Sequence, residues 1–530
     1  MRQPHHLPIP WTGVDRRRTV HRGGVLPSLH GPSSSRSASV GRSPWGTAVT
    51  WDAVVVGSGP GGLSCAAILA AEGRKVVVLE QGASPGGYLA SFRRGRYIFD
   101  AAVDCIAGLD PGGIFTRILK ELGIDEKLQR IRLDPIRVSL FPGLTVRVDA
   151  RLEEYIERLV RLFPAERKGI EDHFRRAGEM YDDLESMTSD VFGEPDGATR
   201  LPAVLGLYRD LSYSEFLGCD IRDRRLAAVL SDRCPFLGLS PRRVSAVRMV
   251  SLVMSYFRSG AFRPAGGHQR LADLLVDGIR NKGGEFLSRK AVKTIFVEGG
   301  RCTRVLTEDG DEFTARHVVS NADPHETLYR RNGDESQRVL AGMPFDHRVS
   351  PSFFVLYAAI SGGVSPPEGA SSIGAFDRFD LDALLNPYLP FRETESLGIS
   401  VPTVTDPSLA PEGHHVVIAH ELVPAGFSVD WNRAKDALAK QLLRKAERVL
   451  PGMSARLVHF EAATPLTLAR YTRNHGGAAF GWEQTPEFPR LRHGIPNLYQ
   501  VGHWSETGSG VLAAAWSGVR AAKRMMKDTL

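Results

Sequence analysis

The feature that most constrains the fold is an ordered series of signals near the start of the chain. Residues 52–56 (DAVVV) form a β-branched apolar run, as expected of a parallel strand that is buried on both faces. A G-x-G-x-x-G motif at 57–62 follows, and the Ala- and Leu-rich stretch 63–72 predicts a helix. A second apolar run at 75–79 then ends on Glu80, about 20 residues past the glycines. This order predicts a βαβ unit that binds a dinucleotide.

Each glycine of this motif has a physical role in holding a dinucleotide. Gly57 permits the tight turn, Gly59 lets the backbone approach the pyrophosphate, and Gly62 lets the helix pack closely on the strand. The free N–H groups at the start of the helix favour the negative phosphates. Glu80 is placed to hold the adenosine ribose hydroxyls. The other loop residues expected around the pyrophosphate are Ser58, Pro60 and Gly61.

A glycine doublet beyond the acidic residue indicates which dinucleotide is bound. Gln81 begins the segment QGASPGG, which ends in Gly86 and Gly87. This extended motif resembles the FAD-binding fingerprint of the flavin amine oxidase and phytoene desaturase superfamily. No second strand-led G-x-G-x-x-G occurs in the sequence, which argues against a separate nicotinamide domain. FAD is therefore the predicted cofactor.

The net charge is uneven along the chain and gives no case for a nucleic-acid partner. Of the total of +7, residues 1–50 carry +6, because they contain seven arginines, no lysine and one acidic residue. This tail is rich in Arg, Ser and Pro and lacks apolar periodicity, so it is predicted to be disordered. A transit peptide and a translation start placed too far upstream are both open explanations for it.

The cysteines and the apolar runs indicate the cellular compartment. The five cysteines are widely spaced and form no C-x-x-C pair, so no metal site is predicted and a reducing cytoplasm is favoured. No run reaches about 18 uninterrupted apolar residues, so no membrane-spanning helix is predicted. The apolar stretch within 248–263 has basic flanks and two interpretations. It is either a peripheral membrane contact through which a lipophilic substrate enters, or a core helix of the substrate domain.

The patterning along the chain predicts an α/β fold with two interleaved domains. A Rossmann-type FAD-binding domain of the glutathione-reductase-like kind alternates with an α+β substrate domain. A chain of 530 residues is long enough to build more than one core. The ranges assigned to the FAD-binding domain are 51–150, 265–330 and 490–530, and those assigned to the substrate-binding domain are 151–264 and 331–489.

Four sequence blocks resemble segments of one group of flavoproteins. They lie at 51–87, 264–275, 318–324 and 497–518, and the segment 471–486 is a further match. The chain is similar to the phytoene desaturase, carotenoid isomerase and retinol saturase group of FAD-dependent oxidoreductases. The resemblance covers nearly everything from Trp51 to Met526.

The resemblance implies roles for residues far from the first motif. Val292 offers its backbone to the adenine, and Gly502 ends the last strand. Gly510 and Val511 form the turn and helix start beneath the isoalloxazine ring. A helix N-terminus at that place stabilises negative charge on the reduced flavin.

Two side chains near this last block are the candidates for a catalytic base. His503 stands where many members of the group have an acidic residue, and Glu506 follows three residues later. A base would remove the proton that leaves beside the transferred hydride. For both residues, the alternative is a hydrogen-bonding role near the flavin without proton transfer.

These expectations combine into one leading function and two alternatives. The leading one is dehydrogenation of carbon–carbon bonds in a long apolar polyene or isoprenoid, with a quinone or oxygen as electron acceptor. Isomerisation or saturation by the same site stays open. One alternative is a natural-product tailoring flavoenzyme that reduces or cyclises a polyene polyketide or macrolactam. The other is a non-catalytic prenyl-lipid carrier of the same fold, against which the intact dinucleotide motif counts.

Overall fold

The computed structural model describes residues 49–189, 203–327, 348–385, 396–426, 429–487 and 494–528. Apart from Val49 and Thr50, the tail predicted at 1–50 lies outside these residues. The helices and strands given below belong to the described part of the chain.

The first sheet has seven strands and contains the predicted βαβ unit. Its strand order is β10-β11-β12-β1-β2-β9, and β18 pairs with the end of β12. The pairs β12–β1, β1–β2, β2–β9 and β12–β18 are parallel. The pairs β10–β11 and β11–β12 are antiparallel. The strands are β1 (Thr50–Val56), β2 (Val76–Leu79), β9 (Glu285–Leu287), β10 (Val292–Glu298), β11 (Arg301–Thr307), β12 (Glu312–Ser320) and β18 (Leu498–Gln500).

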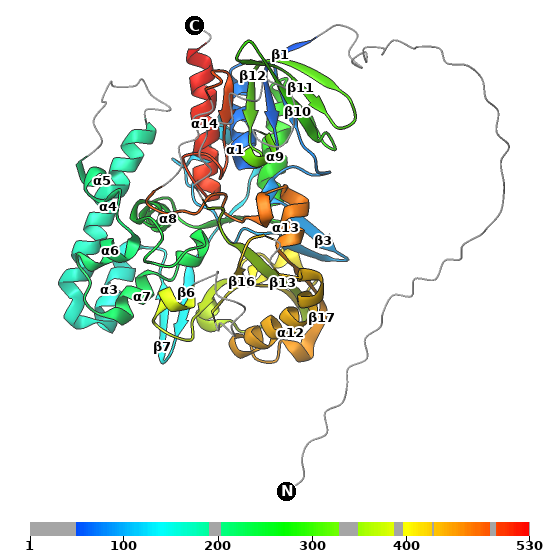
Figure 1. Ribbon diagram of the computed structural model, residues 1–530. Helices are drawn as coiled ribbons and strands as arrows, with labels where there is room; N and C mark the ends of the chain where they lie inside the picture. Colours follow the sequence, from blue (N-terminus) through cyan, green and yellow to red (C-terminus); the bar gives the residue numbers. More distant parts are fainter. Residues whose placement is uncertain are drawn as a thin grey trace, which may run out of the picture. The chain divides into compact units, whose positions relative to one another are not determined.

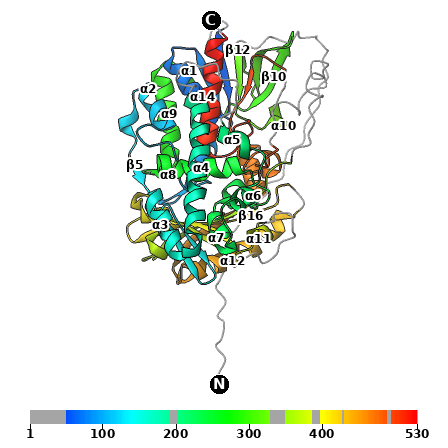
Figure 2. The same cartoon turned by 90° about the vertical axis from the view of Figure 1, so that its left-hand side faces the viewer.

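Both faces of this sheet are buried, which explains the unbroken apolar run in β1. Ala53 and Val55 point to a core shared with helices, whereas Val54 and Val56 point to a second core on the other face. Three helices lie along the first face, with α1 between the other two (Figures 1 and 2). They are α1 (Pro60–Ala71), α9 (Gln269–Asn281) and α14 (Val511–Lys527).

The second sheet also has seven strands, in the order β17-β13-β16-β15-β14-β6-β7. Helix α12 (Trp431–Val449) covers one face, where Trp431 and Leu442 pack with Phe354 and Leu356. The strands are β6 (Arg137–Phe141), β7 (Leu144–Val148), β13 (Ser352–Ser361), β14 (Ser372–Ala375), β15 (Leu397–Ser400), β16 (His414–Val423) and β17 (Leu457–Ala463). On the other face, side chains of β13 point toward the site described below.

The hairpin β6–β7 corrects one predicted boundary. The range 51–150 would place it with the FAD-binding domain, but β6 pairs with β14 in the second sheet, with Val138 opposite Ile373. Val138 is fully buried in the core of that sheet, and this long-range pairing outweighs closeness in sequence. The rest of the predicted domain division stays a prediction.

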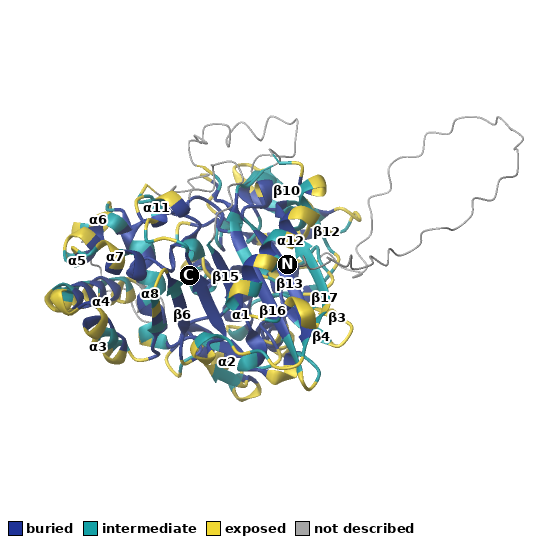
Figure 3. Cartoon of the chain, turned by 90° about the horizontal axis from the view of Figure 1, so that it is seen from below, coloured by how far each residue is buried: buried dark blue, intermediate teal, exposed yellow. Residues whose placement is uncertain are grey.

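A helical layer follows β7 and forms its own core, as the amphipathic pattern at 151–264 predicts. Of the residues of α8, Arg258 alone is exposed, and the buried hydrophobic side chains of the helix belong to the core of this layer. Figure 3 shows exposed residues gathered on α3, α4 and α6, whereas β6 and β15 are largely buried. The helices are α3 (Leu152–Leu162), α4 (Arg167–Ser189), α5 (Ala203–Tyr208), α6 (Tyr213–Gly218), α7 (Arg224–Leu230) and α8 (Ala246–Ser259).

The remaining elements connect these layers. They are β3 (Ser91–Arg94), β4 (Tyr97–Asp100), β5 (Arg130–Arg132), β8 (Phe262–Pro264), α2 (Ile114–Glu121), α10 (Pro324–Thr327), α11 (Leu381–Leu384) and α13 (Pro465–Thr472). Among the described residues, no helix is both long enough and apolar enough to cross a membrane.

Candidate active site

The two glycine-rich segments meet where β1 and β18 end. A Cβ added to Gly61 would lie 2.6 Å from the backbone nitrogen of Gly502, and one added to Gly518 would clash with the carbonyl oxygen of Gly61. These neighbours are backbone atoms, so no rotamer change could relieve the overlap. The glycines therefore let α1 and α14 pack closely and join segments that are far apart in the sequence.

The loop after β1 is held by the acidic residue at the end of β2. The backbone N–H and the hydroxyl of Ser58 both donate to Glu80 Oε2, at 2.9 and 2.5 Å, and Gly82 N donates to Oε1 at 2.7 Å. Gly57 and Gly86 have φ values of 89° and 118°, which only glycine adopts without strain. The carboxylate of Glu80 thus orders the loop, and it also lines the cavity where a ribose would sit.

Asn321, for which the sequence predicts no role, lies where the two glycine-rich segments meet. Side-chain atoms of Asn321 stand within 4 Å of the Cβ positions of Gly57, Gly59, Gly61 and Gly502. Asn321 directly follows β12, whose Ser320 pairs with Val56 of β1. The sequence gives only part of this signal, because it marks 318–324 as a recognised block but does not specify that the strand of this block pairs with β1.

A cavity of about 820 Å³ lies at this edge and is called the nucleotide cavity below. Its position at the carboxyl ends of β1 and β2 is typical of dinucleotide sites. Its polar backbone loop and acidic end fit FAD, with Glu80 at the adenosine side. The predicted residues that line it are Gly57, Ser58, Gly59, Pro60, Glu80, Gln81, Gly87, Val292, Gly502 and His503.

Other predicted residues shape the site without lining this cavity. Gly62 packs against the turn that follows β1, where a Cβ would clash with the carbonyl oxygen of Gly57. Gly86 donates its N–H to Ser58 O at 3.0 Å and so fixes the loop. Gly510 and Val511, at the start of α14, line the neighbouring cavity instead.

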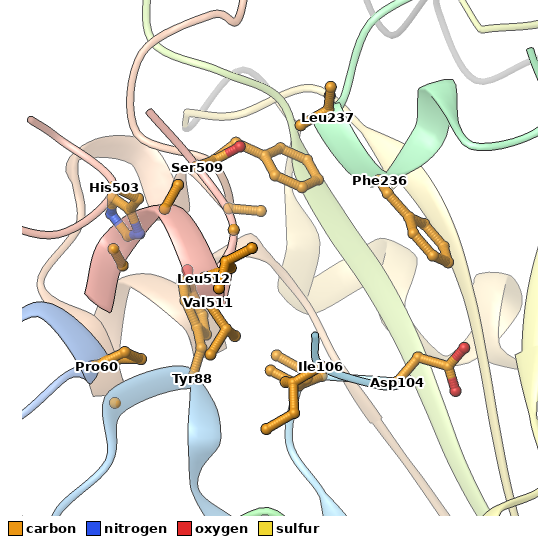
Figure 4. A pocket seen from close by; sticks show the side chains of 18 of the residues that line it. Pro60, Tyr88, Asp104, Ile106, Phe236, Leu237, His503, Ser509, Val511 and Leu512 are labelled. Carbon is orange, nitrogen blue, oxygen red and sulfur yellow. The ribbon is translucent and has the colours of Figure 1, made fainter. Parts of the chain in front are cut away.

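This neighbouring cavity is larger, about 2200 Å³, and is called the substrate cavity. Figure 4 shows Pro60, Tyr88, His503 and Val511 at one side of it, with Asp104 and Phe236 across from them. The two cavities share lining residues, so the nucleotide site opens toward the substrate cavity. These shared residues are Pro60, Glu80, Gly87, Tyr88, Tyr471, Thr472, His503 and Ala514.

His503 stands where the two cavities meet. Burial lowers the pKa of its ring to about 4, so the imidazole is neutral at pH 7. Its Nε2 has no hydrogen-bond partner among the described residues. The ring faces Tyr88 at 5.8 Å between centroids, and burial raises the pKa of that phenol to about 12. A neutral nitrogen that can accept a proton thus lies beside the nucleotide cavity.

Glu506 lies at an exposed part of the substrate cavity. Its side chain is 51% exposed and pairs with Arg520 at 3.3 Å. Its backbone carbonyl accepts from Arg248, which also donates to Thr507 O at 2.6 Å. Burial lowers the pKa of Arg248 to about 10. The hydrogen bonds from Arg248 therefore hold the segment before α14 against α8. Sequence patterns do not predict this contact.

Known proteins match both the sequence and the fold. The family model for flavin containing amine oxidoreductases matches residues 60–526. Prolycopene isomerase 2 of an Oncidium hybrid is 28% identical, over 90% of this chain and 84% of its own. Phytoene desaturase (neurosporene-forming) of Cereibacter sphaeroides is also 28% identical, over 87% and 91%. All-trans-retinol 13,14-reductase of Macaca fascicularis is 25% identical, over 85% and 82%.

Solved structures agree on the architecture. An oxidoreductase from Methanosarcina mazei has a TM-score of 0.59 at 18% identity, with 88% of this chain and 98% of that chain covered. This likeness confirms the α/β FAD-binding fold that the sequence predicts, and the relatives confirm the predicted resemblance to carotenoid desaturases, carotenoid isomerases and retinol saturases. The chain belongs to the family of flavin containing amine oxidoreductases and is an FAD-dependent oxidoreductase.

Proposed function

We propose that this enzyme acts on a carbon–carbon bond of a long apolar polyene or isoprenoid. The observation that carries the proposal is a large cavity that shares part of its wall with the nucleotide site and has many apolar side chains in its lining. Its volume exceeds the roughly 300–1,000 Å³ of common ligand pockets. Apolar lining residues include Ile106, Phe236, Leu237, Val247, Leu252 and Leu512. The names of the isomerase, desaturase and reductase relatives support a polyene.

The residues around the two cavities have different proposed roles. FAD, when bound, supplies the acceptor or donor of the hydride. The N-terminus of α14, at Gly510 and Val511, faces the substrate cavity and favours negative charge there. His503 can accept a proton at Nε2, and the apolar walls exclude water. Dehydrogenation with a quinone or oxygen as final acceptor is the proposed direction, and isomerisation or saturation would use the same groups.

We also propose that the substrate enters from a membrane surface, although not through α8. The lining of the substrate cavity includes Met187, near the end of α4, whose side chain is 48% exposed. On the adjacent α5, Leu207 is 72% exposed. Apolar side chains at a cavity opening suit a peripheral contact with lipid.

The proposed function is tested by adding a polyene, such as phytoene, to the FAD-loaded protein without air. Loss of the flavin absorbance band on addition supports dehydrogenation. If the oxidised flavin does not respond, the reverse experiment adds a more highly conjugated polyene to the reduced protein and follows the return of the flavin absorbance band. The proposal is contradicted if the flavin responds in neither state and no product forms. Conversion between isomers with no net flavin change assigns isomerisation.

The two candidate bases should differ in effect. We expect His503→Gln to lower kcat at least about tenfold, because a base positioned near the flavin contributes roughly 10²-fold or more. Glu506→Gln should leave kcat within about twofold, since that carboxylate is exposed and paired with Arg520. Steady-state kinetics with matched FAD content measures both. Equal losses in the two variants would argue against the proposed role of His503.

The pH profile gives a second check on His503. Because the pKa of the ring is lowered to about 4, its protonation should reduce the rate only as pH falls toward 4. No step in kcat near pH 6.5 should therefore depend on His503. A step near pH 6.5 that disappears in His503→Gln would contradict this reading.

A further inference from the structure

The wall of the substrate cavity across from Pro60 and His503, called the cavity end below, carries polar side chains. Asp104 lies across the cavity from Pro60 and His503, beyond Ile106 (Figure 4). The ring of His420, on β16, and the hydroxyl-bearing Tyr256, on α8, also line the cavity. A site for a pure hydrocarbon has no use for a carboxyl group at the place where the chain would end.

The carboxyl group of Asp104 is held in its charged form by its surroundings. Ser400 Oγ donates to Oδ1 at 2.7 Å, and Arg263 Nη1 donates to the backbone carbonyl at 2.6 Å. Burial alone would raise the pKa of Asp104, but Arg263, serine hydroxyls and Arg137 together lower it. The cavity end therefore presents a hydrogen-bond acceptor.

The neighbouring imidazole adds no positive charge. Burial, aided by Arg137, lowers the pKa of His420 to about 4, so the ring is neutral at pH 7. A neutral imidazole can donate from one nitrogen and accept at the other. Asp104 and His420 together suit a group that both donates and accepts a hydrogen bond.

The cations of this region stand behind the cavity wall. Arg263 pairs with Asp100 at 3.3 Å, and Arg137 pairs with Asp232 at 3.4 Å. Neither arginine is among the described residues that line the cavity. A carboxylate or phosphate entering this end would meet Asp104 before any guanidinium group, so an anionic terminus is disfavoured.

We propose that the substrate is a polyene with a terminal hydroxyl group, whose O–H donates to Asp104 with His420 as its second partner. This inference rests on the proposed function and adds the chemistry of the chain end. A methyl terminus would take water from the partly buried carboxylate of Asp104 and would form no hydrogen bond with it. A site built around a substrate hydroxyl discriminates strongly against the analogue that lacks it.

The test compares two polyenes of equal length in the wild-type enzyme, one with a terminal hydroxyl and one with a terminal methyl group. We expect kcat/KM to be at least about 100-fold higher for the alcohol. In Asp104→Leu, the preference should fall below about tenfold through loss of activity on the alcohol, while activity on the hydrocarbon is kept. Ile106→Val is the matched control, because an apolar residue in the same wall should affect both substrates equally.

The outcomes separate this inference from the proposed function. If the loaded enzyme converts neither polyene to a product, whether the flavin is oxidised or reduced, the proposed function fails. If both react with equal kcat/KM, the function stands and the hydroxyl end is overturned. A polyene with a terminal carboxylate that reacts faster than the alcohol also overturns it. If Asp104→Leu does not fold, the preference of the wild-type enzyme alone decides.

Discussion

Replacing Gly61 with valine is expected to leave the protein without bound FAD, with affinity lowered at least about 100-fold. The Cβ of any side chain at this position would lie 2.6 Å from Gly502 N and 2.8 Å from Asn321 Oδ1. Overpacking of this kind costs about 1–3 kcal/mol or more, and here the obstructing atoms include backbone. The two glycine-rich segments would have to separate, and they form the floor of the nucleotide cavity.

The flavin-to-protein ratio after reconstitution measures this effect. Gly206→Val is the matched control, because Gly206 is an exposed residue of α5 with no heavy atom within 4 Å of its Cβ position. That variant should bind FAD as the wild type does. Full FAD occupancy in Gly61→Val would show that FAD binding does not need the contact between the two segments. That result would also contradict the argument that α1 and α14 must pack closely.

The parts of the site that follow from local patterns were predictable. Strand, glycine turn, helix and acidic strand end are all encoded within one short stretch, 52–80, so period and spacing suffice. The C-terminal segment could be joined to it only through resemblance. What brings Gly61 against Gly502 is the parallel pairing of β18 with β12, and no local signal specifies that pairing.

The parts that depend on long-range contacts were not predictable. Asn321 lies in a recognised block, but only the pairing of β12 with β1 places its side chain among the glycines. The position of β6 in the second sheet is set by β14, a strand far along the chain. Asp104 falls in a stretch without apolar periodicity, and its role at the cavity end arises from neighbours on β15 and β8.

A buried charge cluster around Asp100 and Arg263 is the other missed feature, and its loss should give the largest decrease in the free energy of unfolding. We expect Asp100→Ala to lower the free energy of unfolding by about 3–5 kcal/mol, because it leaves Arg263 buried without its partner. The Asp100 carboxylate accepts from Ser91 Oγ at 2.6 Å and His268 N at 2.9 Å, and pairs with Arg263 at 3.3 Å. Urea unfolding measures the change.

The position of Arg263 explains why this cluster matters beyond its own contacts. Its guanidinium reaches Ser400 of β15 at 3.3 Å as well as Asp100 at the end of β4. One buried cation therefore links the second sheet to the segment that follows the nucleotide loop. We expect Asp100→Ala to weaken FAD binding as well as stability, whereas Asp172→Asn, on the outer side of α4, should change neither.

The pH dependence of the Asp100 effect has a definite sign. Burial alone would raise the pKa of Asp100, but His268 and Arg263 hold it well below its usual value near 4. A carboxyl group whose pKa is lowered on folding contributes stability above its unfolded pKa and loses that contribution as pH falls toward the folded value. The contribution of the Asp100 carboxylate to the difference in unfolding free energy between the wild type and Asp100→Asn should therefore shrink as pH falls below about 4. A difference that shrinks between pH 8 and pH 5 would mean that a group other than Asp100 controls the cluster.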